Sequence, residues 1–240
     1  KKCHGRAPTV TSVSPVDGFL AQAARLVDQG ALEAAETAIQ RALQGDPRNL
    51  KAWRMLGDLA ALANDVETAH HCYAHLVALD PGDAQAHYLL GNCLVQLFEF
   101  TRAREAYQRA LVISPRLADA WGNLGNVLKY LGNHRDANAC LLRNIELEAN
   151  AMLRMRKHSN LLISLHFEDS LSHEALFQAH VDWAERYARR WYPVRPPLAR
   201  ARAAGEPLRL GYVSGSLNGQ IVGHFLQNLL AHHDHARFHV

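Results

Sequence analysis

Residues 84–117 read AQAHYLLGNCLVQLFEFTRAREAYQRALVISPRL, and the stretches on either side of this one share its pattern. At a length of 34 residues the matching segments are Val16–Asn49, Leu50–Asp83, Ala84–Leu117 and Ala118–Ala151. Prolines mark the same place near the end of three segments, at Pro47, Pro81 and Pro115, and Ala149 stands at the fourth. Repetition at this period indicates stacked copies of one small unit rather than a single globular core.

The positions that agree between the segments are those that two packed helices need. The small residue of the second helix is Ala35, Ala69, Ala103 and Ala137. The large residue early in the first helix is Phe19, Trp53, His87 and Trp121. A Leu-Gly pair comes next at 56–57, 90–91 and 124–125, while the first segment has Gln22-Ala23. Small residues let two helices approach closely, larger ones fill the space between neighbours, and proline ends the second helix.

A helix pair of this length with these positions resembles the tetratricopeptide repeat. The resemblance covers residues 16–151. It implies an α-solenoid in which each unit packs on the next and the first helices of the units line a concave groove. We therefore expect a mainly α-helical fold for this part of the chain.

Two positions of the first helix, three residues apart, turn polar along the array. One reads Met55, Leu89 and Asn123, and the other reads Asp58, Asn92 and Asn126. An amide side chain both donates to and accepts from an extended peptide backbone. The functional interpretation is a groove that holds protein or peptide substrates, with Asn92, Asn123, Asn126 and Asp58 as binding residues. The alternative is that these side chains are solvated or bridge neighbouring repeats.

Residues 152–192 are expected to form helices that cap the solenoid and link it to the C-terminal part of the chain. A helix over Leu153–Leu165 supplies the different outer face that a terminal repeat needs. Ser172 is predicted to cap the next helix, in which a stripe from Phe177 through His180 to Tyr187 is predicted to pack on a neighbour. Prolines and arginines in 193–207 predict a linker and a domain boundary.

Residues 208–240 have the pattern of a strand, a turn, a helix and a second strand. Leu208–Ser214 is the predicted strand, Gly215 to Gly219 the turn, and the apolar stripe from Ile221 to Leu230 the helix. This order predicts the first βαβ unit of a doubly wound, Rossmann-like sheet that is cut off at Val240. The predicted fold class is thus an α-solenoid followed by the start of an α/β domain.

The order in which the repeats and the later motifs follow one another is a more specific signal of family than any one of them. The repeats are followed by LFQAHVDWA at 176–184, LRLGYVS at 208–214 and VGHF at 222–225. This order resembles the protein O-GlcNAc transferases and the related Spindly-type protein O-fucosyltransferases, particularly their bacterial members. The resemblance implies a GT-B catalytic half of two Rossmann-like domains that transfers a sugar from a nucleotide donor, UDP-GlcNAc foremost, to Ser or Thr hydroxyls.

The chain departs from that family at a catalytic position. Gln220 stands where the family has a histidine implicated in catalysis, and Gln cannot take a proton from a hydroxyl as neutral imidazole can. His224, four residues later, is the hypothetical substitute. The domain that binds the sugar nucleotide would lie beyond Val240, so we expect no cofactor and no catalysis from residues 1–240 alone. The alternative function is a non-catalytic tetratricopeptide scaffold that binds proteins.

Composition excludes several other classes. In 240 residues, 26 Lys and Arg oppose 23 Asp and Glu, and the net charge of +3 is too small for a protein built to bind nucleic acid. No apolar run reaches the roughly 20 residues that span a membrane. Cys3, Cys72, Cys93 and Cys140 show no paired spacing, which predicts reduced thiols and a cytoplasmic location. The chain has 15 histidines, but His70, His71 and His75 are predicted to lie on a solvated face and to bind no metal.

Overall fold

The computed structural model describes residues 14–189, 208–209, 232, 234 and 238–239. The chain divides into two compact units, Lys1–Arg189 and Arg190–Val240. Every regular element described in the first unit is helical. The predicted helical class of the repeats is therefore confirmed.

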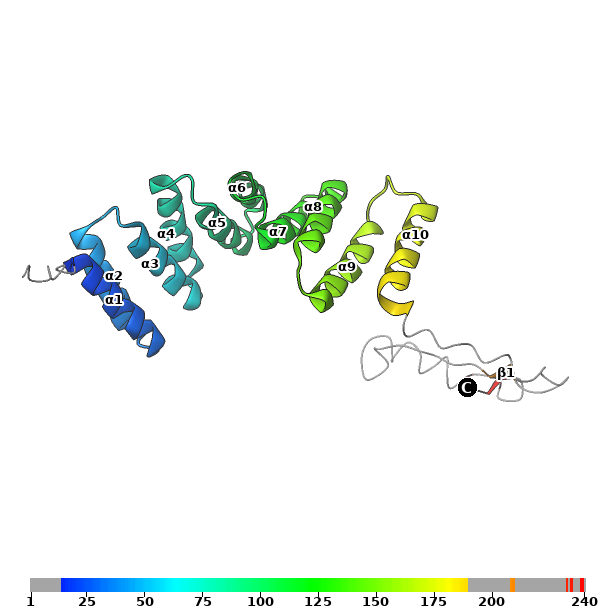
Figure 1. The fold of residues 1–240 in the computed structure, drawn as a ribbon, viewed down its shortest axis with the longest axis horizontal. Helices are drawn as coiled ribbons and strands as arrows, with labels where there is room; N and C mark the ends of the chain where they lie inside the picture. Colours follow the sequence, from blue (N-terminus) through cyan, green and yellow to red (C-terminus); the bar gives the residue numbers. More distant parts are fainter. Residues whose placement is uncertain (1–13, 190–207, 210–231, 233, 235–237, 240) are drawn as a thin grey trace, which may run out of the picture. The chain divides into compact units, whose positions relative to one another are not determined.

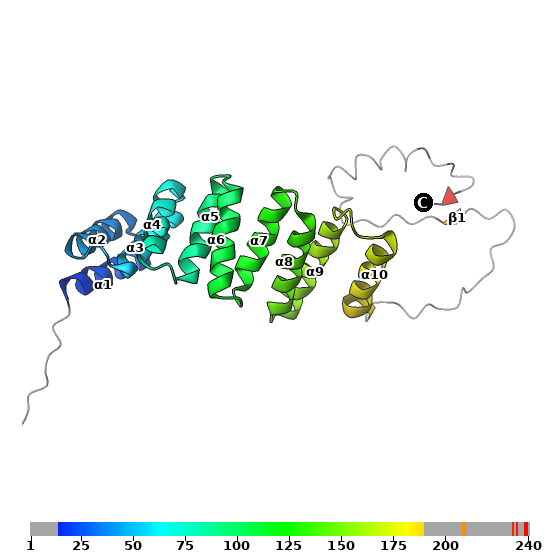
Figure 2. The same ribbon diagram turned by 90° about the horizontal axis from the view of Figure 1, so that it is seen from above.

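Helices of the first unit stand side by side in sequence order, as Figures 1 and 2 show. The first helix of each repeat is α1 (Pro15–Asp28), α3 (Leu50–Leu62), α5 (Ala84–Gln96) and α7 (Ala118–Tyr130). The second helix is α2 (Leu32–Gly45), α4 (Val66–Leu79), α6 (Phe100–Ile113) and α8 (His134–Leu147). We call these two sets the A helices and the B helices. The predicted 34-residue unit is thus one A helix, a tight turn and one B helix.

Close approach of the A and B helices depends on the small residues. The four repeated alanines, Ala35, Ala69, Ala103 and Ala137, are all buried, with at most 1% of their surface exposed. A methyl group added at Gly91 would lie 2.6 Å from the Tyr107 ring, and one at Gly57 would lie 2.7 Å from the Tyr73 ring. In these two repeats the tyrosine of the B helix therefore occupies the space that the glycine of its A helix leaves open.

The large residue early in helix A has a second role that the sequence pattern does not predict. Trp53 Nε1 and Trp121 Nε1 donate hydrogen bonds of 2.9 Å to the carbonyl oxygens of Pro47 and Pro115. His87 Nε2 lies 3.1 Å from the carbonyl oxygen of Pro81. The proline that ends one repeat is thereby tied by its carbonyl to the first helix of the next repeat.

The turn between helices A and B uses one left-handed residue in each repeat. These residues are Gly30, Asn64, Phe98 and Gly132, with φ of 74°, 59°, 60° and 76°. Glycine adopts this conformation without steric cost, and asparagine tolerates it. Phe98 stands at the same place although its side chain opposes the conformation.

Two further helices come after the repeats, α9 (Ala151–Leu165) and α10 (His173–Trp183), and α10 continues into a π-helical turn, η1 (Ala184–Ala188). The predicted cap is confirmed, because the Ser172 side chain accepts a hydrogen bond from the Ala175 amide at 3.1 Å. The predicted stripe is wrong at Phe177, which is 69% exposed. The prediction assumes one continuous α-helix, whereas α10 ends at Trp183 and Tyr187 lies in the π-helical turn, where the number of residues per turn differs.

In the second unit the structure describes two short strands, β1 (Leu208–Arg209) and β2 (Phe238–His239). They pair in parallel, with Leu208 opposite Phe238 and Arg209 opposite His239. The remainder of the predicted βαβ unit, with its turn at Gly215 and its helix from Ile221, lies outside the described residues. The predicted linker over 193–207 also lies outside them.

Candidate functional site

Three of the predicted binding residues lie together. Asn92 of α5 and Asn123 and Asn126 of α7 line one hollow of about 850 Å³, which we call the amide hollow. This volume is within the range of about 300–1,000 Å³ that is usual for ligand sites. Asp58, the fourth predicted residue, lies on α3 and is not part of the lining of the amide hollow.

Hydrogen bonds fix the orientation of the Asn92 amide. Its Oδ1 accepts from the Tyr107 hydroxyl at 2.8 Å and from Asn123 Nδ2 at 2.9 Å. Both lone pairs of this oxygen are therefore used, and no bond to Asn92 Nδ2 is formed within the part of the chain that the structure describes. The two N–H groups of Asn92 remain available, as do the carbonyl oxygen of Asn123 and both ends of the Asn126 amide.

The same contacts include the inter-repeat bridge that the alternative interpretation expects. Asn92 and Asn123 belong to consecutive repeats and are directly hydrogen-bonded. A bridging role and a binding role do not exclude each other here, because each amide uses only part of its hydrogen-bonding capacity in the bridge.

Asp58 repeats the geometry of Asn92 one repeat earlier. The Tyr73 hydroxyl donates to Asp58 Oδ1 at 2.7 Å. Burial raises the pKa of both Tyr73 and Tyr107 well above the ordinary value, so the two hydroxyls stay protonated donors at neutral pH. The hydroxyl thus holds whichever acceptor the A helix places opposite it, a carboxylate in one repeat and an amide in the next.

Besides Tyr107, residues that sequence reasoning did not select line the amide hollow as well, and four of them carry a ring or a charge. They are Lys129 and Tyr130 at the end of α7, His134 at the start of α8, and Phe167 just after α9. Tyr130 is 70% exposed and Phe167 is 60% exposed. Large exposed aromatic side chains at helix ends are the signal that could have pointed to them.

A second hollow of about 390 Å³ adjoins the amide hollow and shares Asn123, Asn126 and Lys129 with it. Lys157 of α9 lies at this hollow, where its Nζ is 2.8 Å from Asn144 Oδ1 and 2.7 Å from Glu148 Oε2. The Lys157 ammonium lowers the pKa of Glu148 from its ordinary value. Lys157 is therefore already engaged within the protein.

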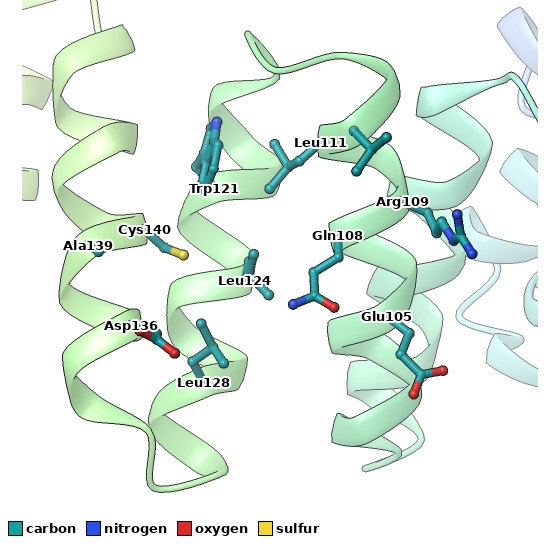
Figure 3. A pocket seen from close by; sticks show the side chains of 11 residues that line it. Glu105, Gln108, Arg109, Leu111, Trp121, Leu124, Leu128, Asp136, Ala139 and Cys140 are labelled. Atoms are coloured by element: carbon teal, nitrogen blue, oxygen red, sulfur yellow. The ribbon is translucent and has the colours of Figure 1, made fainter.

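A third hollow, also of about 850 Å³, lies between the B helices α6 and α8. Figure 3 shows Leu124 and Trp121 of α7 between Gln108 of α6 and Cys140 of α8. Most of its exposed lining is apolar, and its charged groups have both signs: Glu105, Arg109 and Asp136. It presents no array of amides comparable to that on the A helices.

The predicted solvated face on α4 is confirmed for His71, which is exposed, and is wrong for His70 and His75, which are half-buried. The His75 and His71 rings lie 4.2 Å and 6.3 Å from the Trp53 ring, measured between centroids. Within the described residues no three His, Cys, Asp or Glu side chains are grouped so that they could hold a metal ion. Cys72, Cys93 and Cys140 are buried free thiols, and burial raises the pKa of each to about 11.

The two residues predicted for catalysis, Gln220 and His224, lie outside the described residues. Among the helices that the structure does describe, none is both long and apolar enough to cross a bilayer.

Comparison with known families decides what the repeats are. Models of the tetratricopeptide repeat match residues 20–69, 63–118 and 118–150, which together extend over more than half of the chain. The chain belongs to the tetratricopeptide repeat family. The 34-residue unit, its A and B helices and the amide hollow are thus features of a tetratricopeptide repeat protein.

Two curated relatives of this tetratricopeptide repeat protein carry the same name. Each is a probable UDP-N-acetylglucosamine–peptide N-acetylglucosaminyltransferase SPINDLY, one from Oryza sativa subsp. japonica and one from Solanum lycopersicum. The rice protein is 33% identical and the tomato protein 30% identical, each over 81 residues. The matched region is 34% of this chain and spans only 9% of the length of either relative.

Solved structures agree with the fold of the tetratricopeptide repeat protein. A crystal structure of MamA protein is 23% identical with a TM-score of 0.64, over 76% of this chain and 98% of that one. YrrB, described as a TPR protein with an unusual peptide-binding site, is 17% identical with a TM-score of 0.60, over 72% of this chain and 87% of that one. At these identities the likeness concerns the fold.

Proposed function

We propose that this chain is a protein-binding scaffold that holds an extended segment of a partner protein against its A helices. The observation that carries this proposal is the fixed amide of Asn92, whose oxygen is occupied by Tyr107 and Asn123 while its N–H groups remain available in the amide hollow. An extended segment has unpaired backbone N–H and C=O groups that such amides bind irrespective of side-chain sequence.

The test exploits the difference between Asn92 and Asp58. Because Asp58 already accepts from its tyrosine, Asn92→Asp keeps an acceptor for Tyr107 while it replaces the N–H donors by a second carboxylate oxygen and adds one negative charge. Asn126→Asp removes the N–H donors of the second available amide in the same way. The probe is a library of random 12-residue peptides displayed on phage and captured by the whole chain. We expect the double variant to retain at least tenfold fewer peptides than the unmodified chain.

Gln108→Glu is the matched control, because Gln108 is an amide that lines the hollow between the B helices. It should leave peptide capture unchanged. Full capture by the Asn92→Asp, Asn126→Asp chain together with loss of capture by the Gln108→Glu chain would place binding between the B helices and overturn the proposal.

We propose further that the scaffold recruits protein substrates for O-glycosylation. Two observations support this: the partial similarity to the SPINDLY proteins, and the order of sequence motifs that continues to VGHF at 222–225. In this proposal UDP-GlcNAc is the first donor to test, and the acceptors are Ser or Thr hydroxyls of the bound protein. His224 takes the part of the base that Gln220 cannot play.

Sugar transfer from labelled UDP-GlcNAc or GDP-fucose by the full-length protein tests this second step. We expect His224→Ala to abolish transfer and Gln220→His to increase it. If the protein still captures peptides but transfers sugar from neither donor, the glycosylation proposal is overturned and the protein-binding proposal stands.

A further inference from the structure

One side of the amide hollow is lined by aromatic rings and a lysine. Its asparagine amides come from within α5 and α7, whereas Lys129, Tyr130, His134 and Phe167 come from the helix ends and the turn after α9. We call these four residues the aromatic–lysine subsite. They differ from the amides in chemistry, since they offer two large rings and a cation rather than groups that match a peptide backbone.

Each exposed ring of the subsite stacks on a neighbouring ring. Tyr130 stacks on Phe100 of α6, with ring centroids 4.7 Å apart and an angle of 12° between the ring planes. Phe167 stacks on His134, at 5.8 Å and 26°. A ring that is already held in place loses little conformational entropy on binding, and such rings are common energetic anchors of interfaces.

The charge of the hollow is positive. Lys129 is half-buried, and within the described helices no carboxylate lies within 4.0 Å of its ammonium. No Asp or Glu lines the amide hollow. By contrast, Lys157 in the adjoining hollow is paired with Glu148. A half-buried cation without an ion pair beside two exposed rings favours a ligand that brings a carboxylate and an apolar group together.

We propose that the aromatic–lysine subsite selects an Asp or Glu near an aromatic or large aliphatic residue in the peptide that the amides hold. This inference rests on the proposed peptide-binding function. The occupant is an acidic and apolar segment of a partner protein. In an extended peptide, side chains two positions apart point to the same side. The acidic and apolar residues are therefore expected at positions i and i+2.

The composition of the captured peptides tests the subsite. The unmodified chain should enrich Asp or Glu two positions from Phe, Tyr, Trp or Leu in the phage library. Lys129→Glu should replace the acidic preference by a preference for Lys or Arg, with about tenfold weaker binding of the original acidic peptides. Tyr130→Ala and Phe167→Ala should remove the apolar preference and keep the acidic one.

Arg109→Glu supplies the matched charge reversal, because Arg109 is an exposed cation at the hollow between the B helices. It should leave the preference unchanged. One outcome is that the captured peptides show no such preference, although capture is still lost in the Asn92→Asp, Asn126→Asp chain. This outcome would overturn the subsite and would leave peptide binding by the amides standing. A preference that switches with Lys129→Glu but survives the asparagine changes would support the subsite and overturn the backbone-binding role of the amides.

Discussion

The Tyr107 hydroxyl donates a hydrogen bond to Asn92 Oδ1 at 2.8 Å, and in the preceding repeat Tyr73 donates in the same way to Asp58. The tyrosine belongs to the B helix and its acceptor to the A helix of the same repeat. The bond therefore joins the buried interior of a repeat to the polar surface of the A helices. Through it, the packing of the core determines how a groove residue is presented.

Tyr107→Phe should weaken both the core and the groove. Loss of one hydrogen bond between neutral groups costs about 1 kcal/mol of unfolding free energy, which a urea titration measures. The Asn92 amide then keeps only its bond from Asn123 and is free to reverse its two ends, so peptide capture should fall as well. Unchanged peptide capture in a chain that is destabilised as expected would show that the Asn92 orientation does not matter for binding.

Gly91→Ala should destabilise the chain because the added methyl group meets the Tyr107 ring at 2.6 Å. Tyr107 is 1% exposed and has no room to move aside, so an overpacking cost of about 1–3 kcal/mol is expected in urea unfolding. Gly18→Ala is the control. It also lies within an A helix but has no atom within 4 Å of the new methyl group, and it should stabilise the chain by about 0.5–1 kcal/mol through helix propensity.

Phe98→Gly should stabilise the chain, although it removes a large side chain. Phe98 has φ of 60° and is 79% exposed, so relief of left-handed strain, about 1–2 kcal/mol, exceeds the entropy lost by glycine, about 0.5–1 kcal/mol. Gly132→Ala at the equivalent turn has open space around its methyl group and should lose stability through φ alone. A lower thermal midpoint for Phe98→Gly would mean that its edge contact with Phe100, at 6.2 Å between ring centroids, outweighs the strain.

The 34-residue period predicted the helix pairs because the residues that recur with it are those at the contacts between helices. Ala103, for example, is fully buried where α5 and α6 approach each other. The period also predicted that Asn92, Asn123 and Asn126 share a surface, since equivalent positions of a repeat lie in a row along the solenoid. These inferences needed only local periodicity and the stacking of like units.

The aromatic–lysine subsite was missed for the opposite reason. Tyr130, His134 and Phe167 come from the ends of three different helices and occupy different repeat positions, so no period relates them. The hydrogen bonds from Trp53 Nε1 and Trp121 Nε1 to proline carbonyl oxygens are not predicted either. The repeat pattern shows only that a large side chain fills space at this position and says nothing of its N–H group. Phe177 is misplaced because the predicted stripe assumes one continuous α-helix, whereas Tyr187 lies in the π-helical turn η1.

The free energy of unfolding should decrease as the pH is lowered, because of a histidine at the contact between α9 and the π-helical turn η1. Burial, followed by the nearby Arg186 guanidinium, lowers the pKa of His158 below its ordinary value of about 6.5. A histidine with a lowered pKa in the folded state binds more protons when the chain is unfolded. Its contribution to stability is therefore complete above about pH 6.5 and is lost as the pH falls through that value towards the folded-state pKa.

His158→Phe tests this, since an aromatic ring at that place can keep the edge contact with Tyr187, now 5.7 Å between centroids, but cannot titrate. The difference in thermal midpoint between pH 7.5 and pH 5 should shrink in His158→Phe. It should also shrink in Arg186→Gln, because removal of the repelling charge brings the His158 pKa nearer to its ordinary value. An equal acid-induced loss in the unmodified chain and both variants would assign the pH dependence to groups other than His158.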